Sequence, residues 1–158
     1  KTVDRESGPG VRIPLSPQIV FIIRLLVAVL AGSVIGLERQ FHHKSAGLRT
    51  NALVSMGAAI FVMISIQITQ ERGGDATRII GQIVTGIGFL GAGVILHQGF
   101  NIQGLTTAAT IWCSSGIGCL SALGYFKEVA VCVIAVVIVN VALRWLDDKI
   151  KKPDNPES

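Results

Sequence analysis

The amino-acid sequence predicts an all-α membrane protein with five transmembrane helices, the middle two of which form a glycine-rich helical hairpin. Half of its 158 residues are hydrophobic, and the mean hydropathy is +0.59. From Ile79 to Phe126, 48 residues pass without one Asp, Glu, Lys or Arg. Helices of a soluble domain need a polar outer face, so such a domain could not bury this run. About 20 apolar residues cross a bilayer as a helix, so the run holds two spans.

The chain is long enough for one domain and divides into three parts. Residues 1–17, which contain three prolines, are expected to form an irregular lead-in, residues 18–146 the transmembrane domain, and residues 147–158 a polar tail. A net charge of +4 beside apolar spans indicates contact with anionic headgroups, so the expected partner is the lipid bilayer and not nucleic acid.

The first span is expected from Gln18 to Leu37. Small residues recur every four positions at Ala28, Gly32 and Gly36, which predicts a face on which another helix packs closely. Arg24 lies six residues from the start, or about 9 Å along the helix. Its side chain either reaches back to the interface or forms a functional ion pair inside the bundle.

The second span is expected from Thr50 to Thr69, after a loop that carries several basic residues. Asn51 and Ser55 lie one turn apart on it, so both are expected to hydrogen-bond to a neighbouring helix. A charged loop that contains glycines then leads into the hairpin.

The central hairpin supplies a third span, Ile79–Leu96, and a fourth, Gly104–Tyr125, joined by the polar segment His97–Gln103. Each span has a face of small residues at helical spacing, which predicts that these two helices form the packed centre and makes self-association plausible, for example as a dimer. The faces consist of Gly81, Thr85, Gly88 and Ala92 on the third span and of Ser114, Gly118 and Ala122 on the fourth.

The last span, Phe126–Leu146, consists mostly of Val, Ile and Ala and is predicted to face lipid. Asn140 is the single polar side chain between Val129 and Leu143. Five spans place the two ends of the chain on opposite sides of the membrane. Positive charges are almost balanced between the sides, with a slight bias that favours a cytoplasmic first loop and C-terminus.

Gly86 to Gly91 matches the dinucleotide-binding pattern G-x-G-x-x-G letter for letter. That pattern works between a strand and a helix, with an acid about 20 residues later. Here the next acid after Asp75 is Glu128, and the surroundings are a membrane span. No cofactor is therefore predicted, and the glycines are expected to let another helix approach or to loosen the span locally.

The sequence favours neither a metal site nor an enzyme. His42 and His43 are adjacent and so do not share a helix face, and the three cysteines are not at metal-ligand spacing. Glu38 is the only acid expected at membrane depth, which argues against a conventional Mg²⁺ transport site because Mg²⁺ prefers carboxylates. The sequence offers no nucleophile–base pair and no phosphate-binding loop.

The strongest polar cluster is expected at one membrane face. Glu38 and Arg39 end the first span, while Arg49 and Thr50 begin the second, so both pairs should lie at the same membrane face. The cluster is either a charge network that holds the first two helices together or a functional surface. Thr106 and Thr107 begin the fourth span at the same face, where capping of the helix is an alternative role for them.

Four ordered stretches resemble the MgtC/SapB family of bacterial inner-membrane proteins over about residues 20 to 140. The stretches are Gly36–Arg39, Ala46–Val54, Thr85–Gly93, and Gly104–Thr110 with Trp112. The resemblance implies five spans, a cytoplasmic C-terminus, and a link to growth in low magnesium and to survival inside host cells. It also implies that some members bind and restrain the F-type ATP synthase. The family's motif positions here would be Glu38, Arg39, Gly47, Arg49, Thr50, Gly86, Gly88, Phe89, Gly91, Gly93, Gly104, Thr106 and Thr107.

The chain departs from family members that have a soluble domain after the last span, because only a short tail follows here. It is therefore expected to be a short member or a truncated form. The function expected from the sequence is that of a non-enzymatic regulator, with a small ion transporter or channel as the alternative. A transporter would need a polar cavity at the midplane lined by Arg24, Gln82, Thr85 or Asn140, whereas a regulator would leave an apolar helix face for a partner.

Overall fold

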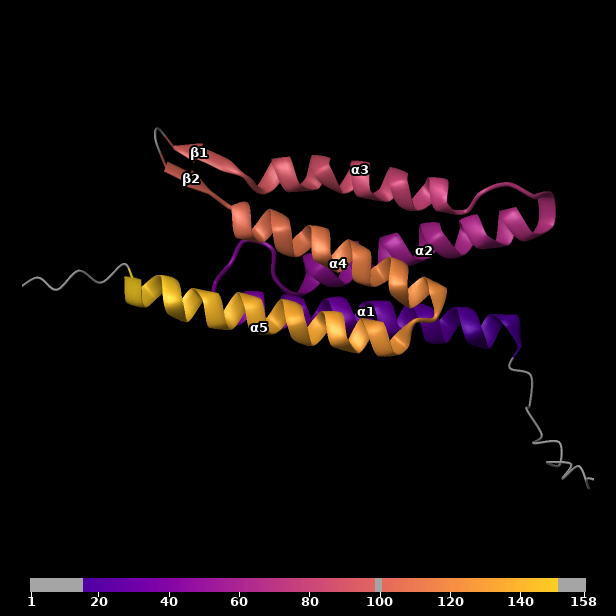
Figure 1. The fold of residues 1–158 in the computed structure, drawn as a ribbon, viewed down its shortest axis with the longest axis horizontal. Coiled ribbons are helices and arrows are strands. Elements are labelled where there is room, and N and C mark those ends of the chain that lie inside the picture. The colour runs from indigo at the N-terminus through magenta and orange to yellow at the C-terminus, as the bar shows by residue number, and fades with distance from the viewer. Residues whose placement is uncertain (1–15, 99–100, 151–158) are drawn as a thin grey trace, which may run out of the picture.

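Five helices and one short β-hairpin make up the described part of the chain, residues 16–98 and 101–150, in a computed structural model. The elements are α1 (Pro17–Phe41), α2 (Leu48–Arg72), α3 (Thr77–Val94), β1 (Leu96–Gln98), β2 (Asn101–Gln103), α4 (Leu105–Leu123) and α5 (Phe126–Ile150). The helices run side by side along one long axis (Figure 1). The predicted fold class is confirmed. Most of the predicted lead-in and residues 151–158 of the tail lie outside the described residues.

α1, α2 and α5 extend beyond the bounds expected from apolarity alone, whereas α3 ends at Val94, before the predicted Leu96, and α4 lies inside its predicted bounds. α1 continues to Phe41 and α5 continues to Ile150, through the first residues of the predicted polar tail. A span predicted from apolar residues stops at the first charges. A helix satisfies its own backbone hydrogen bonds, so it can continue into the polar interface. At its start, α1 is capped by Ser16, whose Oγ accepts a hydrogen bond from the Ile19 N–H.

The polar segment of the hairpin forms β1 and β2, which pair antiparallel with Leu96 opposite Gln103. Gly104 ends this turn and caps α4 with a φ of +92°, a left-handed conformation that favours glycine. A side chain there would also collide with the carbonyl oxygen of Val94. Gly104 is thus required by the turn between the two halves of the hairpin.

Within the described part of the chain, four helices are long and apolar enough to cross a membrane, namely α1, α2, α3 and the part of α5 from Phe126 to Leu146. α4 falls outside this set, and it carries several Ser and Thr residues along its length. Most of these are buried against protein, and α4 lies in the middle of the bundle (Figure 1). A helix that other helices shield from lipid does not need an apolar surface all round.

Close packing is concentrated where α1, α2 and α4 meet. A Cβ on Gly32 would lie 2.5 Å from the Asn51 carbonyl oxygen, and one on Gly36 would lie 2.6 Å from the Leu48 Cα. A Cβ on Gly118 would collide with the backbone of Ser55. The predicted small-residue faces on the first and fourth spans are therefore confirmed as helix-packing faces.

α3 is not part of the packed centre, contrary to the prediction. No residue of α3 is buried, and a Cβ on Gly81, Gly86, Gly88 or Gly93 would meet nothing within 4 Å. The small faces of α4 and α1 are already engaged by α2, which leaves α3 at the rim of the bundle (Figure 1). Half of the hairpin is central and the other half is peripheral.

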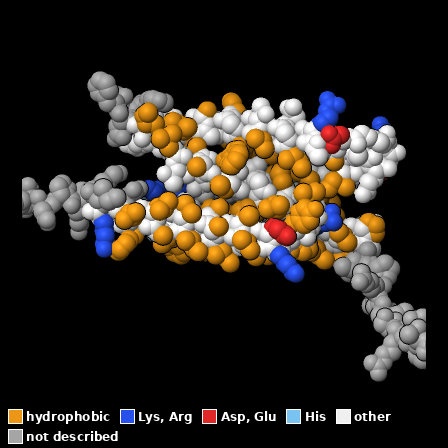
Figure 2. Space-filling model, viewed as in Figure 1, with side chains coloured by type: hydrophobic (Ala, Val, Ile, Leu, Met, Phe, Trp, Pro, Cys, Tyr) orange, Lys and Arg blue, Asp and Glu red, His pale blue; other side chains and the backbone are white. Residues whose placement is uncertain are grey.

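α5 faces outward along most of its length, as predicted. Large apolar side chains such as Val131, Ile134 and Ile138 are exposed, while Val129 is buried against α1. Figure 2 shows hydrophobic side chains running along the helices on this face, with Lys and Arg toward the helix ends. This distribution is typical of a bundle in contact with lipid.

Candidate functional site

A buried polar network lies where α1 ends and α4 begins. Arg39, in the last turn of α1, is only 3% exposed, and its Nη2 donates a hydrogen bond of 2.8 Å to Thr107 Oγ1. Thr107 belongs to the first turn of α4 and is also buried. One buried guanidinium therefore ties the end of one membrane helix to the start of another.

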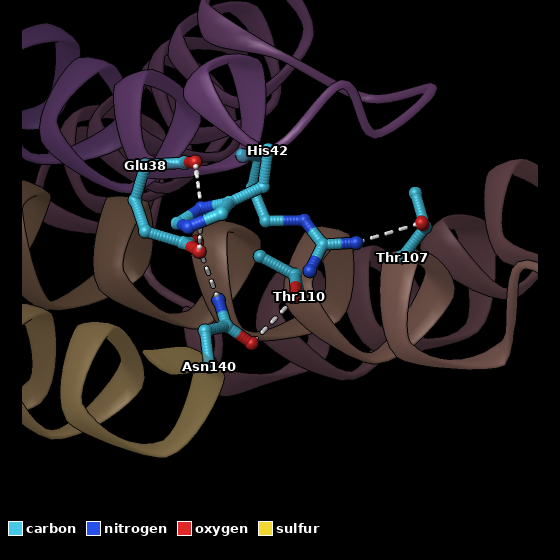
Figure 3. A network of polar contacts seen from close by, with 6 residues as sticks. Glu38, His42, Thr107, Thr110 and Asn140 are labelled. Carbon is cyan, nitrogen blue, oxygen red and sulfur yellow. Dashed lines mark hydrogen bonds and ion pairs between the residues drawn. The ribbon is translucent and has the colours of Figure 1, made fainter. Parts of the chain in front are cut away.

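Glu38 extends this network to α5 (Figure 3). Its Oε2 accepts a hydrogen bond of 3.2 Å from Asn140 Nδ2, and Asn140 Oδ1 in turn accepts from Thr110 Oγ1 at 3.5 Å. The other carboxylate oxygen, Oε1, lies 2.9 Å from His42 Nδ1, one turn further along α1. Three helices are thus joined through a single carboxylate and its neighbours.

Glu38 is the only acid among the described members of this network. Arg39 is adjacent to Glu38 on α1, and Arg144 on α5 is a second positive charge nearby. The Nε of Arg39 is buried without a hydrogen-bond partner among the described residues. Chemically, these groups can hold helices in place and recognise an oxyanion or carbonyl.

A second polar contact holds the start of α2. Asn51 is fully buried, and its Nδ2 donates hydrogen bonds of 3.0 Å to the carbonyl oxygens of Ala46 and Gly47. Its Oδ1 accepts a hydrogen bond of 2.8 Å from Ser114 Oγ on α4. The prediction for Asn51 is confirmed. The prediction for Ser55 is wrong, because its Oγ is buried without a partner among the described residues and its backbone packs on Gly118.

The predicted cluster of Glu38, Arg39, Arg49 and Thr50 does not form within the described residues. All four lie at the same end of the bundle, but Arg49 is exposed, while Arg39 lies on the buried face of α1 and reaches Thr107. Gly47 is the N-cap residue of α2, and a Cβ there would lie 3.1 Å from Gln40 Oε1. The position of Arg39 around the axis of α1 explains why it is buried: Arg39 lies on the same face of the helix as Ala28, Gly32 and Gly36.

The two threonines at the start of α4 have different roles. Thr107 accepts from Arg39, whereas Thr106 is exposed and its carbonyl oxygen accepts a hydrogen bond of 2.8 Å from the Thr110 hydroxyl. Thr110, Asn140 and His42 complete the network and were not predicted to belong to it, although Asn140 was named as a lining residue of a possible transporter cavity. Two features of the sequence could have identified two of these residues: Asn140 is isolated among apolar residues, and His42 follows Glu38 by one helical turn.

The glycine motif of α3 lies apart from this network. A Cβ on Gly91 would be 3.6 Å from the Ala108 Cβ, whereas one on Gly88 or Gly93 would meet nothing within 4 Å, and Phe89 is 82% exposed. Gly86 lines an apolar groove of about 550 Å³ between α2 and α3. The dinucleotide-like pattern lies inside one continuous helix, not at the strand-to-helix turn where it would bind a pyrophosphate.

Arg24 lies at the opposite end of α1 from Arg39, about 22 Å away along the helix. It is half-buried and lines a different cleft, between α1 and α2. Within residues 16–98 and 101–150, no three His, Cys, Asp or Glu side chains gather closely enough to hold a metal ion.

The spanning helices and the buried polar contacts between them define a multi-pass membrane protein. The sequence model of the MgtC family matches residues 25–149. The chain belongs to the MgtC family, and this confirms the family assignment made from the four sequence motifs.

Two curated relatives illustrate the similarity. The chain is 49% identical over 132 residues to Protein MgtC of Salmonella typhimurium strain LT2, covering 84% of this chain and 56% of that protein. It is 50% identical over 119 residues to Protein MgtC of Brucella abortus strain 2308, covering 75% of this chain and 49% of that protein. The chain thus spans about half the length of these relatives. No solved structure matches it.

Proposed function

We propose that this protein is a non-enzymatic regulator of the bacterial inner membrane, with a cytoplasmic C-terminus, and that it acts through contacts between membrane helices. The setting that we propose is magnesium homeostasis or virulence, and the proposed partner is the membrane part of the F-type ATP synthase. One observation carries this proposal: α3 is long and apolar enough to cross the membrane, yet none of its residues is buried.

The groove between α2 and α3 is suited to a helix. Gly57 on α2 and Gly86 on α3 line it, and a Cβ on either would meet nothing within 4 Å, so a foreign backbone can approach both. Ser115 of α4 also lines the groove and is only 3% exposed, and its hydroxyl makes no hydrogen bond among the described residues. A helix can supply a polar partner for this hydroxyl, which a lipid acyl chain cannot.

The alternative function, a small ion transporter, is favoured by the buried charge of Arg39, because charged groups inside membranes often mark ion pathways. The expected pore lining is nevertheless dispersed. Gln82 lines an apolar groove, Arg24 lines a cleft at the opposite end from Asn140, and Thr85 is exposed on the rim. We therefore expect Mg²⁺ flux into proteoliposomes to equal that of empty vesicles. Protein-dependent flux that is lost in the Arg39→Gln variant would show that the protein is a transporter and would contradict the proposed regulatory function.

Photo-crosslinking in membranes tests the proposed partner. A photoreactive residue at Ile87, in the groove, is compared with one at Val139, which is exposed on the outer face of α5. We expect an adduct with an ATP synthase membrane subunit, identified by mass spectrometry, at Ile87 and not at Val139. Filling the groove with Gly86→Leu should remove it.

The same experiment tests the expected homo-oligomer. An adduct of twice the chain mass at Ile87 would show that a second copy occupies the groove and would contradict the ATP synthase as its occupant. Adducts with lipid alone at both positions would contradict any helix partner at this groove.

A further inference from the structure

A cleft of about 810 Å³ lies at the end of the bundle remote from the Arg39 network. It exists because the helices differ in length: α1 and α2 have 25 residues each, whereas α4 has 19 and ends at the Gly124 cap. Arg24 lies beside Gly124, so the preceding turns of α1 continue about 10 Å past the end of α4. The facing turns of α2 do the same, and nothing in the described residues fills the space between them.

The lining of this cleft is amphiphilic. One part is apolar, and the other consists of glutamine amides and a single cation, with no acid among the described residues that line it. The apolar part comprises Pro17, Val20, Phe21, Ile22, Met63 and Ile66, and the polar part comprises Gln18, Gln67, Gln70 and Arg24. The amide of Gln67 donates at 3.3 Å to Glu71, which is exposed and lies outside the lining.

Arg24 is not matched by a carboxylate within the described residues. The ion pair of His42 with Glu38 lies at the other end of the bundle. The guanidinium of Arg24 lies against the C-terminus of α4, since a Cβ on Gly124 would be 3.4 Å from Nη2. A helix C-terminus offers at most about half a negative charge, so a full anionic charge can still be accommodated. A guanidinium binds phosphate oxygens in a two-pronged geometry.

We propose that this cleft binds the headgroup of an anionic phospholipid, with its phosphodiester on Arg24. The amides of Gln18 and Gln70 donate to the phosphate or glycerol oxygens, and the upper part of the acyl chains lies along Phe21 and Ile66. A free phosphate would gain nothing from the apolar walls. A zwitterionic headgroup would bring an ammonium group into a lining whose described residues include a cation and no acid.

Native mass spectrometry of the purified full chain tests the proposal, with phosphatidylglycerol and phosphatidylcholine as the probes. We expect a retained phosphatidylglycerol, which Arg24→Gln should weaken about tenfold because a charge-assisted contact is lost. The matched control is Arg72→Gln, since Arg72 is exposed at the same end and does not line the cleft. Equal weakening by the two substitutions, or equal retention of both lipids, would overturn the proposal.

Two further measurements keep the test decisive. If Arg24→Gln does not fold, Ile66→Trp fills the cleft while keeping Arg24, and it should also release the lipid. Retention of phosphatidylglycerol by a folded Ile66→Trp protein would overturn the proposal. Inorganic phosphate should not raise the unfolding temperature, whereas phosphatidylglycerol should. An equal rise with phosphate would show that the cleft takes a small anion and not a lipid.

Discussion

α4 and α3 are the two halves of one hairpin and are both rich in small residues, yet one is central and the other peripheral. Gly118 of α4 touches the backbone of Ser55, whereas a Cβ on Gly88 of α3 would meet nothing within 4 Å. The polar side chains also differ. The Ser114 hydroxyl of α4 donates to Asn51 on another helix, while the Thr85 hydroxyl of α3 donates to the Gly81 carbonyl oxygen of its own helix.

The comparison teaches that small residues permit close helix packing but do not cause it. Between helices in lipid the hydrophobic effect provides little attraction, so dispersion and interhelical hydrogen bonds decide which faces associate. α4 has hydrogen bonds to α1 through Thr107 and to α2 through Ser114. The described residues of α3 show no hydrogen bond to another helix. Just before α3 begins, the Ala76 carbonyl oxygen accepts a hydrogen bond of 3.5 Å from the Ser65 hydroxyl of α2.

The largest expected effect is the contrast between Gly118→Leu and Gly88→Leu. At Gly118 the side chain must displace the backbone of α2, so we expect destabilisation of more than about 3 kcal/mol and loss of a folded species. At Gly88 the side chain projects into open space, so the protein should remain folded. Thermal unfolding followed by size-exclusion chromatography measures both. Equal sensitivity at the two positions would mean that α3 is packed against a partner in the sample.

Asn51→Ala and Thr85→Ala sharpen the comparison for polar groups. Asn51 makes buried hydrogen bonds to Ala46, Gly47 and Ser114, so its removal should lower the free energy of unfolding by about 1–3 kcal/mol. Thr85 is exposed and bonds within α3, so its removal should change stability by less than about 0.5 kcal/mol. Unfolding titrations in mixed micelles provide the two values. A Thr85 effect as large as that of Asn51 would contradict the peripheral position of α3.

The smallest effect concerns the helix starts. Hydrogen bonds from the Thr77 hydroxyl and N–H lower the pKa of Asp75, just before α3. A lowered folded-state pKa contributes stability that is present above the usual Asp value and is lost as pH falls through the lowered one. The start of α3 should therefore fray below about pH 4.

Hydrogen exchange at neutral and acidic pH, corrected for intrinsic rates, measures this fraying. The start of α1 is the matched control, because its cap is the hydroxyl of Ser16, which does not titrate in this range. Asp75→Asn should remove the pH dependence at α3. Equal acid sensitivity at both helix starts would show that Asp75 is not its source.

Much of the fold could be predicted from the sequence because it follows from local patterns. The long uncharged run required spans, the four-residue spacing of Ala28, Gly32 and Gly36 marked a packing face, and the Val- and Ile-rich last helix indicated contact with lipid. The candidate site could be predicted only in part. Glu38, Arg39 and Thr107 were identified, but Arg49 was wrongly joined to them and the place of Asn140 beside Glu38 was missed.

The sequence by itself determined that the chain crosses a membrane, where the helices lie and which faces carry small residues, since these depend on neighbours along one helix. Only the tertiary structure decided that α3 lies at the rim and that Arg39 bonds Thr107 instead of meeting Arg49. Those outcomes depend on the rotation of each helix about its axis and on competition between similar faces for one partner. The differences in energy that settle them arise from a few hydrogen bonds and close contacts between residues far apart in the chain.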